Sequence, residues 1–89
     1  MAVVAKYYGV PQKVLKGGSR RQSAVFARAV AVHLARELGG MSYERIGHAL
    51  GGRDHTTMMH NYRKIRGELP HDLPTRQAVE DLRRILLSG

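Results

Sequence analysis

The sequence contains no cysteine and no tryptophan, and its aromatic residues are limited to four Tyr and one Phe. Without cysteine the chain can form neither a disulfide framework nor a thiolate metal site, which fits a reducing compartment. With so few aromatic rings, the core has to be built from aliphatic side chains. A hydrophobic content of 43% over 89 residues is typical of one folded unit, and we expect a single domain over residues 1–89.

Long apolar runs are also missing. No stretch approaches the ~20 apolar residues that span a membrane. The first ten residues, MAVVAKYYGV, lack the basic region and apolar run of a signal peptide. We therefore expect a cytoplasmic chain with no transmembrane segment.

Acidic residues are absent from the first 36 positions, which hold seven Lys or Arg, and the formal net charge of the chain is +8. Charge this uneven points to a polyanionic partner, either nucleic acid or an anionic membrane surface.

The spacing of apolar residues predicts helices and no strand, so we expect an all-α fold, a small helical bundle. The longest helix, over 23–38, carries one apolar stripe, with Arg28 and Arg36 lying off it. A closing helix is expected within 73–89, where Pro74 marks the start. The remaining helices are expected over 11–16, 43–50 and 54–69.

Residues 42–69 have the pattern of a helix-turn-helix. Ser42 and Asp54 are the expected N-caps, and Gly51-Gly52 forms the turn between the two helices. In the second helix an apolar face runs through Met58, Tyr62 and Ile65. At 100° per residue, the opposite face carries Thr56, His60 and Arg63, which are therefore available to a partner.

Metal binding and catalysis find little support in the residues. His55 and His60 are five positions apart, which does not give the i, i+4 pair of a helical zinc site. No serine lies in a nucleophile motif, and KGGSRR is not a phosphate-binding loop. We predict no enzyme activity, no metal and no cofactor.

Base reading fits the start of the second helix better. Asp accepts from cytosine, the Thr methyl contacts the thymine methyl, and His bonds a base edge or a phosphate. Helix capping alone also explains Asp54 and Thr57, and both interpretations stay open.

The segment GGRDHTT followed by MMHNYRKI, and preceded by LARELGGMSYERIGHAL, closely resembles the C-terminal DNA-binding domain, domain IV, of the bacterial replication initiator DnaA. Through VAKYYGV and VLKGGSRRQS the resemblance covers roughly residues 3–66. It implies sequence-specific binding of double-stranded DNA at an asymmetric DnaA box, TTATNCACA. The GGRDHTT helix would read the major groove, and an arginine of the basic loop would enter the adjacent minor groove.

The resemblance implies three kinds of DNA contact. Base contacts fall to Asp54, His55, Thr56 and Thr57. Backbone contacts fall to Arg28, Arg36, Arg53, His60 and Lys64. The minor-groove contact falls to Arg20, with Arg21 as its replacement.

The chain departs from the family pattern at three points. Ala29 stands where Gln is common, Glu44 stands where Pro is frequent, and the SRRQS loop carries less charge than many family loops. These 89 residues include no ATPase domain, so, if they are the whole protein, we expect no ATP hydrolysis of the kind that an initiator performs.

Two origins are compatible with this pattern: an excised initiator domain, or a free-standing regulator of replication or transcription. The Met start and the LLSG end favour a small complete protein. We expect a monomer on one box. The alternative function is a membrane-surface or protein-binding adaptor that uses residues 23–38 as an amphipathic helix.

Overall fold

The computed structural model of the chain describes residues 2–18 and 20–88, which form six helices and no strand. The all-α fold class is therefore confirmed, and each expected helix is present with its ends shifted by a few residues at most. The helices are α1 (Ala2–Tyr8), α2 (Gln12–Lys16), α3 (Gln22–Gly39), α4 (Tyr43–Ala49), α5 (His55–Glu68) and α6 (Leu73–Ser88).

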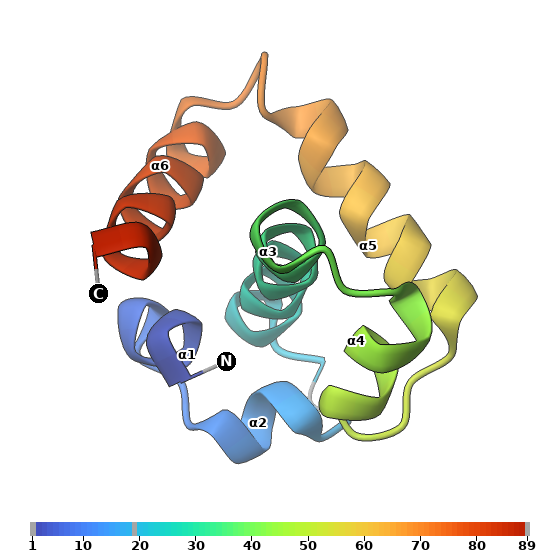
Figure 1. Cartoon of the computed structure of the whole chain (residues 1–89). Coiled ribbons are helices and arrows are strands. Elements are labelled where there is room, and N and C mark those ends of the chain that lie inside the picture. The colour runs from blue at the N-terminus through green and yellow to red at the C-terminus, as the bar shows by residue number, and fades with distance from the viewer. Residues whose placement is uncertain (1, 19, 89) are drawn as a thin grey trace.

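The central helix is α3, which packs against each of the other five (Figure 1). Every residue from Ala27 to Leu34 is buried. The expectation of one apolar stripe is wrong for this helix, because its middle is enclosed on all sides. Small alanine side chains in the middle of α3 let the surrounding helices approach closely.

The enclosed position of α3 also removes the surface on which the adaptor alternative depended. A helix that binds a membrane surface needs one free apolar face, whereas the apolar residues in the middle of α3 are covered by other helices. Within residues 2–18 and 20–88, no helix is long and apolar enough to cross a bilayer.

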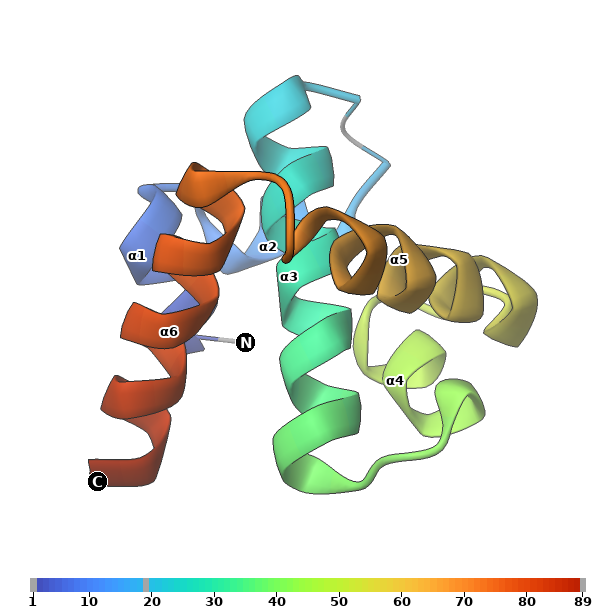
Figure 2. The same cartoon turned by 90° about the horizontal axis from the view of Figure 1, so that it is seen from above.

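Four of the other helices form two groups on opposite sides of α3. In both views α1 and α6 lie on one side, and α4 and α5 lie on the other (Figures 1 and 2). Each fully buried aliphatic side chain in the core contributes roughly 1.5–3 kcal/mol of transfer free energy. The largest fully buried apolar side chains are Leu15, Ile46, Leu50, Met58, Ile65 and Leu82.

The sequence pattern did not predict α1. The segment Ala2–Tyr8 has only seven residues, includes two β-branched valines and has no acidic residue in its first turn. Tertiary packing forms this helix instead. Val4 and Ala5 are buried in the core, and the Tyr8 ring meets the edge of Phe26 at a centroid distance of 5.7 Å.

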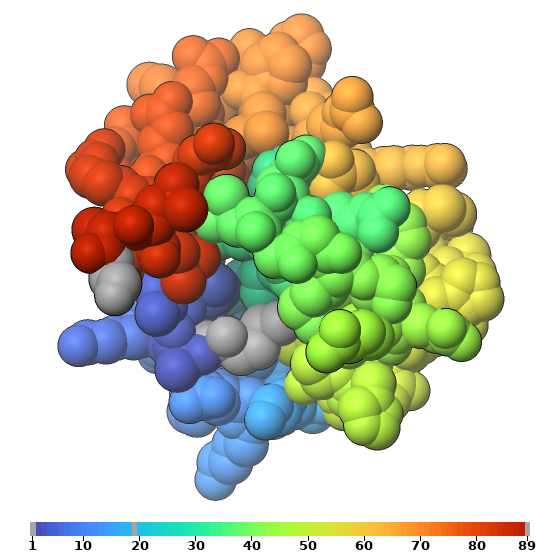
Figure 3. All heavy atoms as spheres, in the orientation of Figure 1, coloured from blue at the N-terminus to red at the C-terminus, as the bar shows by residue number. Residues whose placement is uncertain are grey.

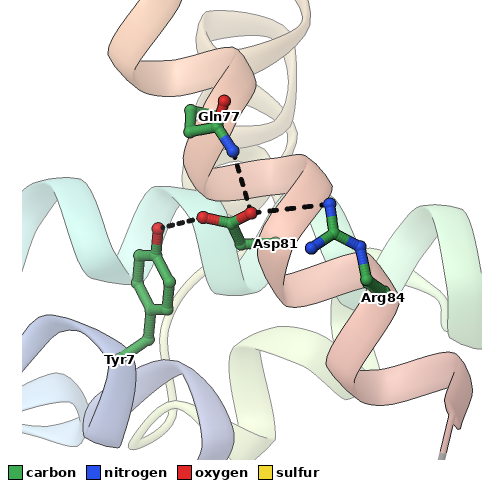
Figure 4. Close-up of polar contacts among 4 residues, drawn as sticks. All are labelled: Tyr7, Gln77, Asp81 and Arg84. Carbon is green, nitrogen blue, oxygen red and sulfur yellow. Dashed lines mark hydrogen bonds and ion pairs between the residues drawn. The ribbon is translucent and has the colours of Figure 1, made fainter.

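A polar cluster joins α1 to α6 (Figure 4). The Tyr7 hydroxyl donates a hydrogen bond to Oδ2 of Asp81 at 2.9 Å. On α6 itself, Gln77 Nε2 donates to Oδ1 of Asp81 at 2.9 Å, and the Arg84 guanidinium lies 3.7 Å from the same oxygen. The hydrogen bond to this carboxylate raises the pKa of Tyr7 above its usual value. The first and last helices are thereby connected.

The link from α3 to α4 is set by two local signals. Gly40 adopts a left-handed conformation (φ 59°), and its amide donates to the Arg36 carbonyl, which ends α3. Ser42 then caps α4 by accepting from the Arg45 backbone N–H at 3.2 Å. These two signals determine where the helix-turn-helix begins.

Candidate nucleic-acid interface

The start of α5 is fixed by a side-chain cap. Asp54 has extended backbone angles (φ −64°, ψ 141°), and its carboxylate accepts a hydrogen bond from the Thr56 backbone N–H at 3.2 Å. Nδ1 of His55 lies 3.6 Å from the other carboxylate oxygen. The Asp54 and His55 side chains are 64% and 63% exposed. The capping role predicted for Asp54 is confirmed, and the carboxylate stays open to solvent.

One face of α5 is turned outward. Met58 and Ile65 are fully buried, and Tyr62 is half-buried. The outward direction predicted from helical spacing is therefore confirmed. Arg63 also lies on this face, although the family resemblance assigned it no DNA contact. Its helical spacing from Thr56 and His60 is the signal that marks it as a candidate contact. The exposed side chains of the helix include His55, Thr56, Thr57, His60, Arg63 and Lys64.

A glycine turn connects α4 to α5. Gly51 has a φ of 88°, and a Cβ atom there would collide with the Lys16 carbonyl oxygen at the end of α2. A Cβ at Gly47 would collide with the Arg53 carbonyl oxygen, while the Gly47 carbonyl accepts from the Arg53 amide at 2.8 Å. The turn therefore packs directly on α2, and α4 packs directly on the residue that precedes Asp54.

Arg53 uses its guanidinium inside the protein. Its Nη1 donates to the Leu50 carbonyl at 2.9 Å, and its Nη2 donates to the Gly17 carbonyl. The side chain is half-buried. Both contacts direct the guanidinium to backbone oxygens of the protein, whereas the family resemblance assigned it to the DNA backbone.

Arg28 is buried, with a relative exposure of 8%. Its Nε donates to the Leu15 carbonyl at 2.8 Å, and its Nη2 donates to the carbonyls of Val14 and Gly17 at 3.1 and 3.2 Å. Burial lowers the pKa of Arg28, and the positive charge of Arg53 lowers it further. The expectation that Arg28 lies off the buried surface is therefore wrong, because its guanidinium is bonded to carbonyls at the end of α2.

The basic loop keeps both of its arginines exposed. Arg20 lies between α2 and α3, and Arg21 is the residue immediately before α3. Ser19, in the same loop, lies outside the described residues. The loop starts beside the helix-turn-helix, because Gly17 is bonded to the Arg53 side chain.

Arg36 has a different environment from the other candidate cations. Its side chain is exposed at the end of α3, but Nη1 donates to the Met41 carbonyl at 3.0 Å. The guanidinium carbon also lies 4.5 Å from the centre of the Tyr43 ring. Arg36 thus supports the link between α3 and α4.

Beneath the exposed face, α5 is held to α3 by a buried histidine. His33 is 4% exposed, and its ring stacks on Tyr62 with a centroid distance of 5.2 Å and an interplanar angle of 18°. The Tyr62 hydroxyl donates to Glu37. Burial lowers the pKa of His33; the Glu37 carboxylate opposes this shift, and Arg66 adds to it. The same hydroxyl lowers the pKa of Glu37.

Histidines do not gather into a metal site in the part of the chain that the structure describes. No group of three or more His, Asp or Glu side chains there is close enough to hold an ion. His55 and His60 are both exposed on α5.

The space-filling view shows α4 and the start of α5 on one side of the molecule, with α1 and α6 on the other (Figure 3). Two helices joined by a close glycine turn, the second with a capped and exposed start, define a helix-turn-helix of the DNA-binding class. The family model described as the bacterial dnaA protein helix-turn-helix matches residues 1–65. The chain belongs to this family, and membership implies DNA binding.

Two relatives carry the name chromosomal replication initiator protein DnaA. The protein from Herpetosiphon aurantiacus is 41% identical over 83 residues, and the one from Streptococcus pyogenes is 43% identical over 82 residues. The alignments cover 93% and 92% of this chain, respectively. The chain spans 18% of the length of each relative.

Proposed function

We propose that the chain, as one domain, binds double-stranded DNA sequence-specifically at a DnaA-box-like site. The start of α5 is the observation that carries the proposal. Four consecutive residues, Asp54 to Thr57, are exposed on a capped helix whose opposite face is buried. Unpaired backbone N–H groups at such a helix start favour phosphate, and the short polar side chains let the helix approach base edges.

In this proposal α5 enters the major groove by its first turn. Asp54 accepts from a cytosine amino group, the Thr56 and Thr57 methyl groups contact thymine methyls, and His55 bonds a base edge or a phosphate. Arg20 enters the adjacent minor groove, and Arg21 lies next to it. The exposure of all these side chains supports this assignment.

Phosphate contacts come from the exposed face further along α5. His60, Arg63 and Lys64 are exposed there, and cationic side chains that neutralise phosphates release counterions on binding. Arg28 and Arg53 are left out of this group, because their guanidinium groups are bonded to backbone carbonyls.

A single chain would occupy a single box, since the family box is asymmetric and needs no two-fold partner. Two biological settings fit such binding: the DNA-binding part of an initiator, or a separate regulator that occupies boxes. In both settings the domain acts in the cytoplasm, on the nucleoid.

The test is a gel shift with a duplex that carries TTATCCACA and a scrambled duplex of the same composition, over a series of salt concentrations. We expect preference for the box and a fall of about 0.9 in log K per phosphate contact for each tenfold rise in salt. Vesicles of phosphatidylglycerol test the adaptor alternative. Equal binding to both duplexes, or binding to vesicles alone, would contradict the proposal.

A further inference from the structure

Two arginines converge on one backbone carbonyl, that of Gly17. Arg28 Nη2 donates to it at 3.2 Å, and Arg53 Nη2 donates to it as well. Gly17 is the residue at which the basic loop leaves α2, and Arg53 directly precedes Asp54, the cap of α5. The carbonyl and Arg53 are 36 positions apart in the sequence. One acceptor therefore joins the start of the loop to the start of the proposed recognition helix.

The other donors of the two arginines hold this junction in place. Arg28 also bonds the Val14 and Leu15 carbonyls of α2, and Arg53 also bonds the Leu50 carbonyl at the end of α4. Carbonyls at helix C-termini lack partners within the helix and carry partial negative charge. A guanidinium satisfies several of them at once, because it presents five donors in a rigid fork.

The junction is also tight in space. The Lys16 carbonyl lies so close to Gly51 that no Cβ fits between them. The last turn of α2 and the glycine turn before α5 are thus in direct backbone contact. Arg53 bonds across this contact, and Arg28 holds the end of α2 from α3.

Fixing Gly17 confines Arg20. Arg20 follows Gly17 by three positions, and a fully extended chain spans at most ~3.6 Å per residue, so the Arg20 Cα stays within ~11 Å of the Gly17 Cα. When two contact elements are held at a matching spacing, the second contact forms intramolecularly at high effective concentration. If the start of the loop were not held at Gly17, the effective concentration of the second contact would be lower.

We propose that Arg28 and Arg53 are positioning residues that hold the basic loop beside α5, so that minor-groove and major-groove contacts form together on one box. This inference rests on the proposed function, in which Arg20 enters the minor groove. It assigns Arg53 a role that differs from a direct phosphate contact. The contribution of Arg20 to DNA affinity depends on Arg53.

A double-mutant cycle with Arg20→Ala and Arg53→Lys tests this dependence. Lysine keeps the charge but cannot bond two carbonyls in fixed geometry. In the wild-type background we expect Arg20→Ala to lower affinity for the box about tenfold. In the Arg53→Lys background we expect the same change to lower it less than about threefold, since coupled residues lose additivity. Circular dichroism at the assay temperature verifies that each variant is folded.

Arg63→Ala is the matched control. Arg63 is an exposed cation on α5, outside the junction, so its effect should add to that of Arg20→Ala. Additive effects for Arg20 and Arg53 would overturn the positioning role and identify Arg53 as an independent contact. Lack of box preference in the wild-type chain would instead overturn the proposed function, which keeps the two failures distinct.

Arg28→Lys provides a second cycle in case Arg53→Lys loses its fold. Arg28, on α3, bonds the same Gly17 carbonyl, so the effect of Arg20→Ala should shrink in that background too. A full tenfold effect of Arg20→Ala in a folded Arg28→Lys chain would count against the inference.

Discussion

Replacing Asp54 by asparagine separates base reading from helix capping. The Asp54 carboxylate caps α5 through one hydrogen bond of 3.2 Å and is 64% exposed. Asparagine caps about as well as aspartate. Its amide still accepts a hydrogen bond, but it adds a donor that a cytosine amino group cannot use.

The expected magnitudes differ between the two roles. Loss of the cap altogether, as in Asp54→Ala, should destabilise the fold by ~1 kcal/mol, a shift in melting temperature of roughly 4–8 °C for a chain of this size. Asp54→Asn should change stability by less than this, because only the charge interaction with the helix dipole is lost, about 0.3–1 kcal/mol. A lost base contact costs ~1–3 kcal/mol, which is about 5- to 150-fold in affinity.

The assay combines thermal melting with binding to a set of duplexes that differ at one base pair of the box, and to a scrambled duplex. Thr56→Ala serves as a second variant, because the Thr56 backbone N–H that Asp54 caps is unchanged. We expect Asp54→Asn to relax preference at one base pair, with a melting temperature lowered by no more than the loss of the helix-dipole interaction accounts for. If both variants lowered the melting temperature and left the box-to-scrambled ratio unchanged, GGRDHTT would be a folding motif only.

Four further outcomes are expected. Lys64→Ala should weaken box and scrambled DNA alike and reduce the salt slope by about 0.9, as measured by fluorescence anisotropy; a loss confined to the box would contradict a phosphate contact. Tyr7→Phe should remove the hydrogen bond to Asp81 and lower stability by ~1 kcal/mol in denaturant titrations, while DNA affinity stays the same. Because the pKa of His33 is lowered in the folded chain, the unfolded chain binds its proton first as pH falls below ~6.5, so the free energy of unfolding should decrease from pH 7.5 to 5. His33→Phe should abolish this decrease, whereas the lowered pKa of Glu37 acts only nearer pH 4. Sedimentation should show one chain per box, and a stable free dimer would contradict this.

Local signals were sufficient to predict much of the fold and the exposed face of α5. The Asp54 cap and the outward direction of Thr56 and His60 follow from residue type and helical spacing alone. Both are set by neighbours within one or two turns of the chain, which is the range over which periodicity carries information.

Features that depend on distant partners could not be predicted in this way. The spacing within its own helix predicts Arg28 to be a surface cation. Its guanidinium instead donates to backbone carbonyls at the end of α2, 11 to 14 positions earlier in the sequence. The acceptor of Arg53 lies 36 positions away. α1 likewise depends on burial against α3 and on a bond between Tyr7 and Asp81, 74 positions apart.

The Tyr7–Asp81 hydrogen bond has a practical consequence for handling the protein. It holds the first and last helices together, on the side of α3 away from α4 and α5 (Figures 1 and 2). A fluorophore attached to an exposed residue of α1 or α6 therefore lies on the side of α3 away from the glycine turn and the start of α5. The same holds for immobilisation on a sensor surface: a linker attached to an exposed residue of α1 or α6 leaves the helix-turn-helix facing the solution.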